Sequence, residues 1–293
     1  MKRLPAIFLL LVTTLFWGIT FTVVKRAVEE VDVFVFLSQR FFAAFFILLP
    51  VSLFRISHLS IKVLRDGIIL GFFLFASYAF QTTALRYTTA SNAGFLTGLN
   101  VIFVPLFGAF LFRQVINTQV RWAVLLATVG LFLLTTNGIW TFNRGDLLAT
   151  ICAVFIAFHL ILTGEFTRTS DTCWLTTIQL GVVALLSFLV AQWGGHPVLI
   201  WHREIVWALV ICVLFATIFA FLVQTSAQRI IRPAHTALLF CMEPVFAALY
   251  AYWADGEKLG FYGISGAGFI LTGMILSELP VSRGPLQSGL PDR

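Results

Sequence analysis

Glu243 is the most prominent ionisable residue within the apolar stretches of this sequence. It stands in the run FCMEPVFA, directly before Pro244. A charge at the centre of a bilayer costs at least about 2.5 to 3.5 kcal/mol on insertion scales, so an acid there is expected to bind a proton or a substrate amine. Pro244 lacks an N–H and is expected to free the carbonyl oxygen of Phe240 and to kink the helix. A structural interpretation stays open, in which Glu243 is protonated or pairs with Arg40 and fixes helix packing.

Three basic side chains are further candidates for coupling or gating. His235 precedes Glu243 by eight residues, about two helical turns, so the two side chains are expected to border one cavity. Arg40 is a second charge inside an apolar run, where a structural partner is the favoured interpretation and a substrate carboxylate is the alternative. Lys25 is expected to reach the membrane interface, with a gating or anion-binding role as the alternative.

The neutral candidates are residues whose polar atoms could line a cavity. His159 on an apolar helix is more typical of a core histidine than of a ligand. Gln81 and Gln224 are expected to contact either a substrate or a neighbouring helix. Trp17 and Tyr78 combine an apolar wall with one polar atom.

Patterns for catalysis or metal binding are not found in the sequence. There is no H-E-x-x-H, no G-x-S-x-G and no Walker-type phosphate loop. The cysteines stand singly in apolar runs, which indicates small buried hydrophobic residues: Cys152, Cys173, Cys212 and Cys241. We therefore expect neither an enzyme nor a bound cofactor or metal.

The composition indicates an integral membrane protein. Of 293 residues, 59% are hydrophobic and only 11% are charged, and the mean hydropathy is +0.96, so there is too little polar surface to cover a water-soluble body. A membrane helix needs about 20 apolar residues. Ten such runs are predicted, at about residues 4–24, 33–54, 67–86, 90–112, 121–138, 146–166, 172–192, 204–225, 233–254 and 259–278. The polar tail 281–293 is expected to be disordered.

Orientation follows from the Lys and Arg residues between the runs. About twelve lie on the side of the N-terminus and about six on the other, with Arg40 inside a span. The net charge of +6 therefore reflects topology rather than nucleic-acid binding. We expect both termini to be cytoplasmic, in the inner or plasma membrane.

Two halves of the chain resemble one another. The segment QTTALRY from Gln81 aligns with QTSAQRI from Gln224 at an offset of 143, and FWGITF aligns with FIAFHL at an offset of 139. These offsets place Asn100 opposite Glu243. The chain is therefore predicted to be all-α, with ten transmembrane helices in two five-helix repeats, residues 1–140 and 141–280. Because five is odd, the repeats must be inverted, an arrangement that permits alternating access.

Several motifs resemble the drug/metabolite transporter superfamily, and its EamA-type members in particular. They are FWGITFTVVK, SQRFFAAFF, ALRYTTASNAGFLTGLNVIFVPL and MEPVFAALYAYWADGE. The resemblance implies a secondary transporter without ATP, often an exporter, with a cavity lined by spans 1, 3, 4, 6, 8 and 9. One departure is that the second half has Gly256–Glu257 where the first half has Arg113–Gln114.

The function expected from these features is export of a small organic metabolite such as an amino acid, with proton coupling as a candidate mechanism. The expected partners are a small solute and the lipid bilayer, without nucleic acid or an ATPase subunit, in a monomer or homodimer. The alternatives are a membrane enzyme acting on lipid, a passive channel and an interaction subunit.

Overall fold

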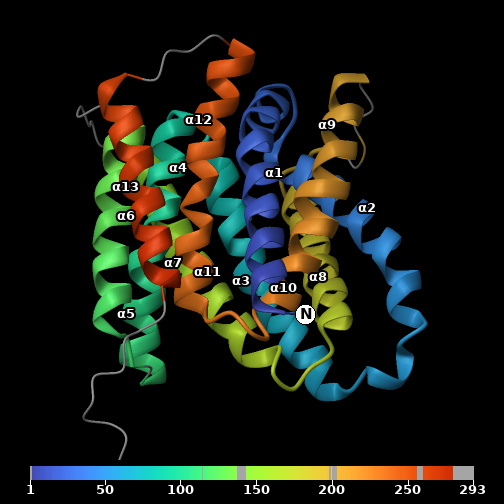
Figure 1. Cartoon of the computed structure of the whole chain (residues 1–293). Coiled ribbons are helices and arrows are strands. Elements are labelled where there is room, and N and C mark those ends of the chain that lie inside the picture. Colours follow the sequence, from blue (N-terminus) through green and yellow to red (C-terminus); the bar gives the residue numbers. More distant parts are fainter. Residues whose placement is uncertain are drawn as a thin grey trace, which may run out of the picture.

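The computed structural model describes residues 2–113, 115–136, 143–197, 199, 203–255 and 260–279. Within these ranges the chain is helical and forms no strand, as predicted (Figure 1). The tail 281–293, Gln114 and the Gly256–Glu257 pair lie outside them. The helices are α1 (Arg3–Glu30), α2 (Val33–Leu53), α3 (Ile61–Ala84), α4 (Ala90–Gly98), α5 (Asn100–Phe112), α6 (Thr118–Thr136), α7 (Arg144–Phe166), α8 (Thr172–Trp193), α9 (Arg203–Val213), α10 (Ala220–Ala227), α11 (Pro233–Phe240), α12 (Met242–Asp255) and α13 (Phe261–Glu278).

These helices account for the predicted membrane crossings. Nine helical segments of the described ranges are long and apolar enough to cross a membrane, including Ala93–Leu111 and Ile205–Ala227. The helices α11 and α12 follow one another in the same direction and provide a tenth crossing (Figure 1). The prediction of an all-α membrane protein is confirmed. We refer below to the Arg3 end of the bundle, where α1 begins, and to the opposite Lys25 end.

Two of the crossings are interrupted near their middles. The crossing made by α11 and α12 is broken at Cys241, where the helix tightens for one turn: the Cys241 N–H is shared between the carbonyls of Ala237 and Leu238 at 3.3 and 3.2 Å. This break lies three residues before Pro244, beside which a kink was predicted. The break between α4 and α5 at Leu99 was not predicted. There the Asn100 side-chain Nδ2 donates to the Thr97 carbonyl oxygen at 2.7 Å and competes with the backbone hydrogen bonds of the helix.

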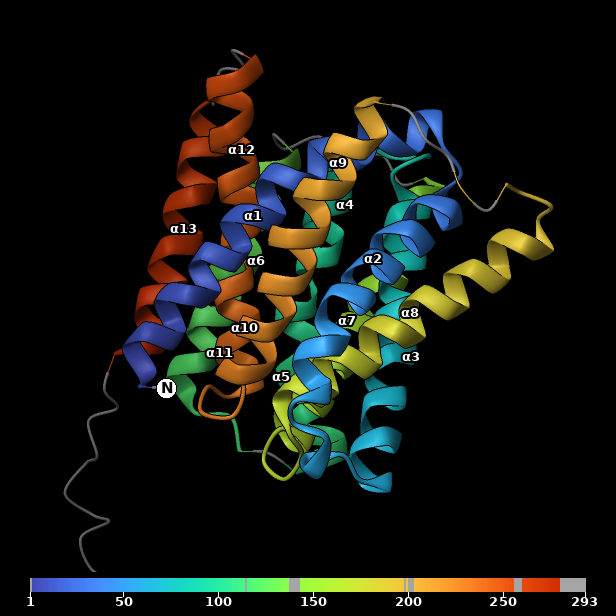
Figure 2. The same ribbon diagram turned by 90° about the vertical axis from the view of Figure 1, so that its right-hand side faces the viewer.

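Two N-terminal caps follow the repeat. Asp32 precedes α2 and Asp171 precedes α8, and each carboxylate accepts from the N–H groups two and three positions later, at 2.9 to 3.3 Å. The caps are 139 positions apart (171 − 32), which is one of the offsets found in the sequence. The helices α2 and α8 pack side by side, and each begins near the end of the other (Figure 2).

Close helix packing depends on glycine at two interfaces. A Cβ at Gly18 of α1 would lie 2.7 Å from the backbone oxygen of Glu243 in α12. A Cβ at Gly266 of α13 would lie 2.5 Å from the backbone nitrogen of Leu134 in α6. Small residues at such crossings let membrane helices approach closely.

The four cysteines are buried and free, as the sequence indicates.

Candidate functional site

A cavity of about 420 Å³ lies between the helices. Its wall runs from Gln224 and His159 in the interior to Lys25 and Gly260, so it extends toward the Lys25 end. All six spans that the resemblance implied contribute to the wall, together with α2, α6 and α13. Nine of the ten candidate residues line it: Trp17, Lys25, Arg40, Tyr78, Gln81, Asn100, His159, Gln224 and Glu243.

Several residues of the wall are related by the offsets found in the sequence. Offsets of 139 or 143 relate pairs of residues that both line the cavity: Thr20 and His159, Tyr78 and Phe221, Gln81 and Gln224, and Asn100 and Glu243. The aligned residues therefore face a shared space, but the chemistry at the aligned positions differs.

Glu243 lies in the first turn of α12, just after the break at Cys241. It is half-buried and lines the cavity. Its charge acts on the Tyr78 hydroxyl and on the Cys152 thiol, so it lies close to both. In the described part of the chain no ion pair joins Glu243 to Arg40. The interpretation that the two residues pair is therefore wrong for this structure.

Arg40 is held by neutral groups. Its side chain is 3% exposed, and its Nε donates to Thr217 Oγ1 at 2.7 Å. Its Nη2 donates to the Ala216 carbonyl at 3.1 Å and to the Tyr78 hydroxyl at 3.4 Å. Trp17 Nε1 donates to the same carbonyl at 2.9 Å. Ala216 and Thr217 belong to a π-helical turn between α9 and α10, a feature frequent at functional sites.

His159 belongs to a hydrogen-bonded chain whose direction can be derived. Gln228 Nε2 donates to the Leu160 carbonyl at 2.8 Å, so its Oε1 must accept from Gln224 Nε2 at 3.2 Å. Gln224 Nε2 then also donates to His159 Nδ1 at 3.5 Å, and His159 Nε2 donates to Gln179 Oε1 at 2.8 Å. Both ring nitrogens are satisfied in the neutral Nε2–H tautomer. The core interpretation therefore accounts for His159, although its ring borders the cavity.

Two amide side chains of the cavity wall, Gln81 and Asn100, have hydrogen-bonding atoms without a partner among the described residues. Gln81 is half-buried and makes no side-chain hydrogen bond to any residue that the structure describes, whereas Gln224 is held in the chain above. Asn100 is buried, and its Oδ1 has no hydrogen-bond partner among the described residues. These amides can therefore hydrogen-bond to a bound molecule.

His235 lies elsewhere, which corrects the expectation that it shares a cavity with Glu243. It lines a separate pocket of about 350 Å³ at the Arg3 end, where Arg3 and Glu278 form an ion pair at 2.9 Å. Eight residues of helix correspond to roughly 12 Å along the axis. Around the helix axis, His235 lies at an angle that would allow it to face the cavity. Along the axis, it lies too far from Glu243, beyond the inner end of the cavity.

Several polar residues were missed in the sequence. Gln179 could have been found from the sequence, because it aligns with Arg40 at the offset of 139. Thr217 could not, because nothing in the apolar run around it indicates a π-helical turn. Asp66 and Asp146 are fully buried. Asp66 accepts from Ser170 and Asp146 accepts from Thr88, both outside the cavity.

Comparison with known proteins gives one consistent result. Residues 4–136 and 143–279 match the model of the EamA-like transporter family. A protein of Archaeoglobus fulgidus named an uncharacterized transporter is 32% identical over 280 residues, 96% of this chain and 88% of its own length. Uncharacterized transporter YyaM of Bacillus subtilis is 22% identical, covering 95% of each chain. A solved crystal structure has a TM-score of 0.79 at 20% identity and covers 94% of this chain and 97% of its own, which shows the shared fold.

Proposed function

Because the chain belongs to the EamA-like transporter family, we propose that it is a secondary transporter that moves a small organic metabolite across the cell membrane by alternating access. The observation that carries this proposal is the cavity, whose wall combines equivalent positions of the two halves and includes the intramembrane acid Glu243. Sites of this kind lie between inverted repeats, at discontinuous helices near the bilayer midplane. The breaks at Leu99 and Cys241 fit that description.

We assign the two repeats to residues 1–140 and 141–280. The separate family matches to residues 4–136 and 143–279 support this division. The caps Asp32 and Asp171 at opposite ends of the bundle support the inversion. By the excess of Lys and Arg, the Arg3 end faces the cytoplasm and the cavity extends toward the outside.

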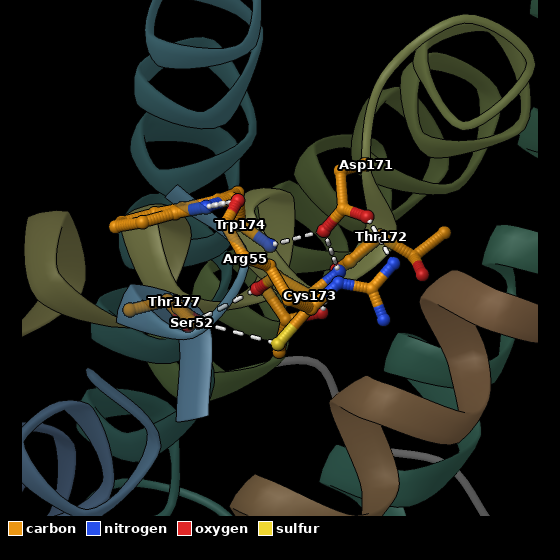
Figure 3. A network of polar contacts seen from close by, with 8 residues as sticks. Ser52, Arg55, Asp171, Thr172, Cys173, Trp174 and Thr177 are labelled. Carbon is orange, nitrogen blue, oxygen red and sulfur yellow. Dashed lines mark hydrogen bonds and ion pairs between the residues drawn. The ribbon is translucent and has the colours of Figure 1, made fainter. Parts of the chain in front are cut away.

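Ion pairs at the two ends fit a cycle of opening and closing. At the Arg3 end, Arg55 just beyond α2 holds the α8 cap Asp171 at 2.6 Å, and Trp174 Nε1 donates to the Arg55 carbonyl (Figure 3). At the Lys25 end, His196 just beyond α8 lies 3.5 Å from the α2 cap Asp32. The tighter contact is at the end away from the cavity. We propose that the two contacts tighten and loosen alternately as access changes.

Glu243 is the proposed coupling group. A carboxyl group that lines the cavity and makes no ion pair with a described residue can take up a proton from one side and release it to the other. Asn100 at the equivalent position hydrogen-bonds but does not titrate. Export by proton antiport is the direction that we propose, with a metabolite such as an amino acid as the solute.

Counterflow in proteoliposomes tests this function. A panel of metabolites is offered as labelled solutes to vesicles preloaded with the same unlabelled compound. We expect saturable counterflow of at least one solute, which Glu243→Gln should retain because solute exchange needs no net movement of protons. The matched control is Glu29→Gln at an exposed position outside the cavity, which should behave as the wild type. Saturable activity on a lipid with no counterflow would replace the proposal by that of a membrane enzyme.

A further inference from the structure

We propose that Arg40 forms a subsite for a carboxylate group of the transported solute, bound through its Nη1. This inference rests on the proposed function, because it specifies what the cavity recognises. A guanidinium has five N–H donors. Three of them are used by Thr217, Ala216 and Tyr78, through Nε and Nη2. The two hydrogens of Nη1 make no hydrogen bond to a residue that the structure describes, so they are left for a molecule in the cavity, whose wall includes Arg40.

Among the described residues, the charge of Arg40 lacks a counterion. Arg40 is 3% exposed as a residue, and none of their carboxylates lies within ion-pair distance of its guanidinium. Buried charges are ordinarily paired, since transfer from water is costly. The faces of Tyr78 and Phe41, at 5.1 and 5.4 Å from the guanidinium carbon, compensate part of this cost. An anion bound from the cavity would compensate more of it.

The guanidinium is also oriented before any ligand arrives. Thr217 accepts a hydrogen bond from Nε of Arg40, and the Ala216 carbonyl accepts from both Arg40 Nη2 and Trp17 Nε1. Two groups of the π-helical turn therefore fix the plane of the guanidinium. An oriented donor loses less conformational entropy when it binds. A flexible lysine at this position would make none of these contacts in the same geometry. The arrangement is that of a built binding site, in contrast to a charge that only fixes helix packing.

The charges of the cavity favour a carboxylate over a phosphate. Arg40 extends from α2 and is held against the π-helical turn, and the Tyr78 hydroxyl lies close enough to interact with the charges of both Arg40 and Glu243. The two ionisable groups therefore act on one part of the cavity. A single negative charge matches Arg40, because the other cation of the wall, Lys25, lies about two helical turns beyond Trp17 in α1, toward the Lys25 end. A dianionic phosphate at Arg40 would exceed the positive charge there and face repulsion from an ionised Glu243. The acceptors of Glu243 and Asn100 suit hydrogen-bond donors elsewhere on the same solute.

Thermal stability of the purified protein in detergent, titrated with propionate at constant ionic strength, tests the subsite without transport. We expect a saturable rise in Tm with propionate and no such rise with propionamide or with phosphate. In Arg40→Gln the rise should vanish. In Thr217→Val, which keeps the charge but removes the Nε acceptor, we expect the affinity for propionate to fall about tenfold or more. Lys62→Gln, an equal charge change at an exposed site outside the cavity, should respond as the wild type.

Three results would overturn the proposal. They are no saturable response in the wild type, an undiminished response in both Arg40→Gln and Thr217→Val, and a response to phosphate equal to that for propionate. If Arg40→Gln does not fold, Thr217→Val decides the question. Propionate binding without counterflow of any solute would leave the subsite standing and contradict transport. Counterflow confined to neutral or cationic solutes would support transport and contradict the carboxylate subsite.

Discussion

Asn100 and Glu243 stand 143 positions apart, and each lies within two residues of a break in a membrane-crossing helix. Both line the same cavity. The Asn100 side chain donates to the Thr97 carbonyl at its break, while the Glu243 side chain makes no hydrogen bond to a residue that the structure describes. The amide therefore takes part in the break of its own helix, and the acid is left to respond to protons or solute. This difference between equivalent positions is the basis of the proposed coupling.

Gly18 should be intolerant of any side chain. In Gly18→Ala the new Cβ would lie 2.7 Å from the Glu243 carbonyl and 2.9 Å from the Ala247 nitrogen, forcing α1 and α12 apart. We expect destabilisation of about 1 to 3 kcal/mol and reduced transport. The control is Gly268→Ala, where a Cβ would meet no atom within 4 Å. Thermal denaturation in detergent measures both variants, and equal stability of the two would contradict the assignment.

His159 should contribute to stability through both of its ring nitrogens. In His159→Phe the facing groups of Gln179 and Gln224 lose a partner, so a loss of about 1 to 3 kcal/mol is expected. His58→Phe makes the same change at an exposed position and should be nearly neutral. Thermal denaturation is again the measurement. A stable His159→Phe that abolishes binding of every solute would show instead that the ring is a ligand.

Closure of the Lys25 end should depend on Asp32. Its carboxylate lies 3.5 Å from His196 Nε2 and 3.8 Å from Arg86 Nη2, so it holds the start of α2 near the ends of α8 and α3. Asp32→Asn weakens both contacts and should favour opening of this end. With Thr22→Cys as a reporter in the cavity wall, labelling by a polar thiol reagent should quicken by a factor of up to about five.

The matched control is Asp171→Asn, the same change in the cap at the Arg3 end, where it weakens the contact with Arg55. Added to the same reporter, it should not quicken labelling from the Lys25 end. Equal labelling rates in Asp32→Asn and in the unmodified reporter would contradict the proposed closing contact.

Much of the site could be predicted because the membrane makes polar residues conspicuous. Trp17, Arg40, Gln81 and Glu243 were identified from their types within apolar runs, and the structure brings them to one cavity. The crossings could be predicted because each needs about 20 apolar residues. The offset of the internal repeat then aligned Asn100 with Glu243.

Three features could not be predicted from the sequence, because the hydrophobic periodicity of a helix does not encode them. The π-helical turn that holds Arg40 occupies the uniformly apolar run LFATIF. The break at Leu99 has its proline, Pro105, six residues later inside α5, so proline position alone did not locate it. His235 was misplaced because a helical projection gives the angle around the axis but ignores the distance along it.

The most direct test of coupling is solute accumulation driven by an imposed proton gradient in proteoliposomes. The wild type and Glu29→Gln are predicted to accumulate solute against its gradient. Glu243→Gln is predicted to equilibrate solute by counterflow but not to accumulate it, because its side chain at this position cannot exchange a proton. Accumulation by Glu243→Gln equal to that of the wild type would contradict the central claim that Glu243 couples transport to protons.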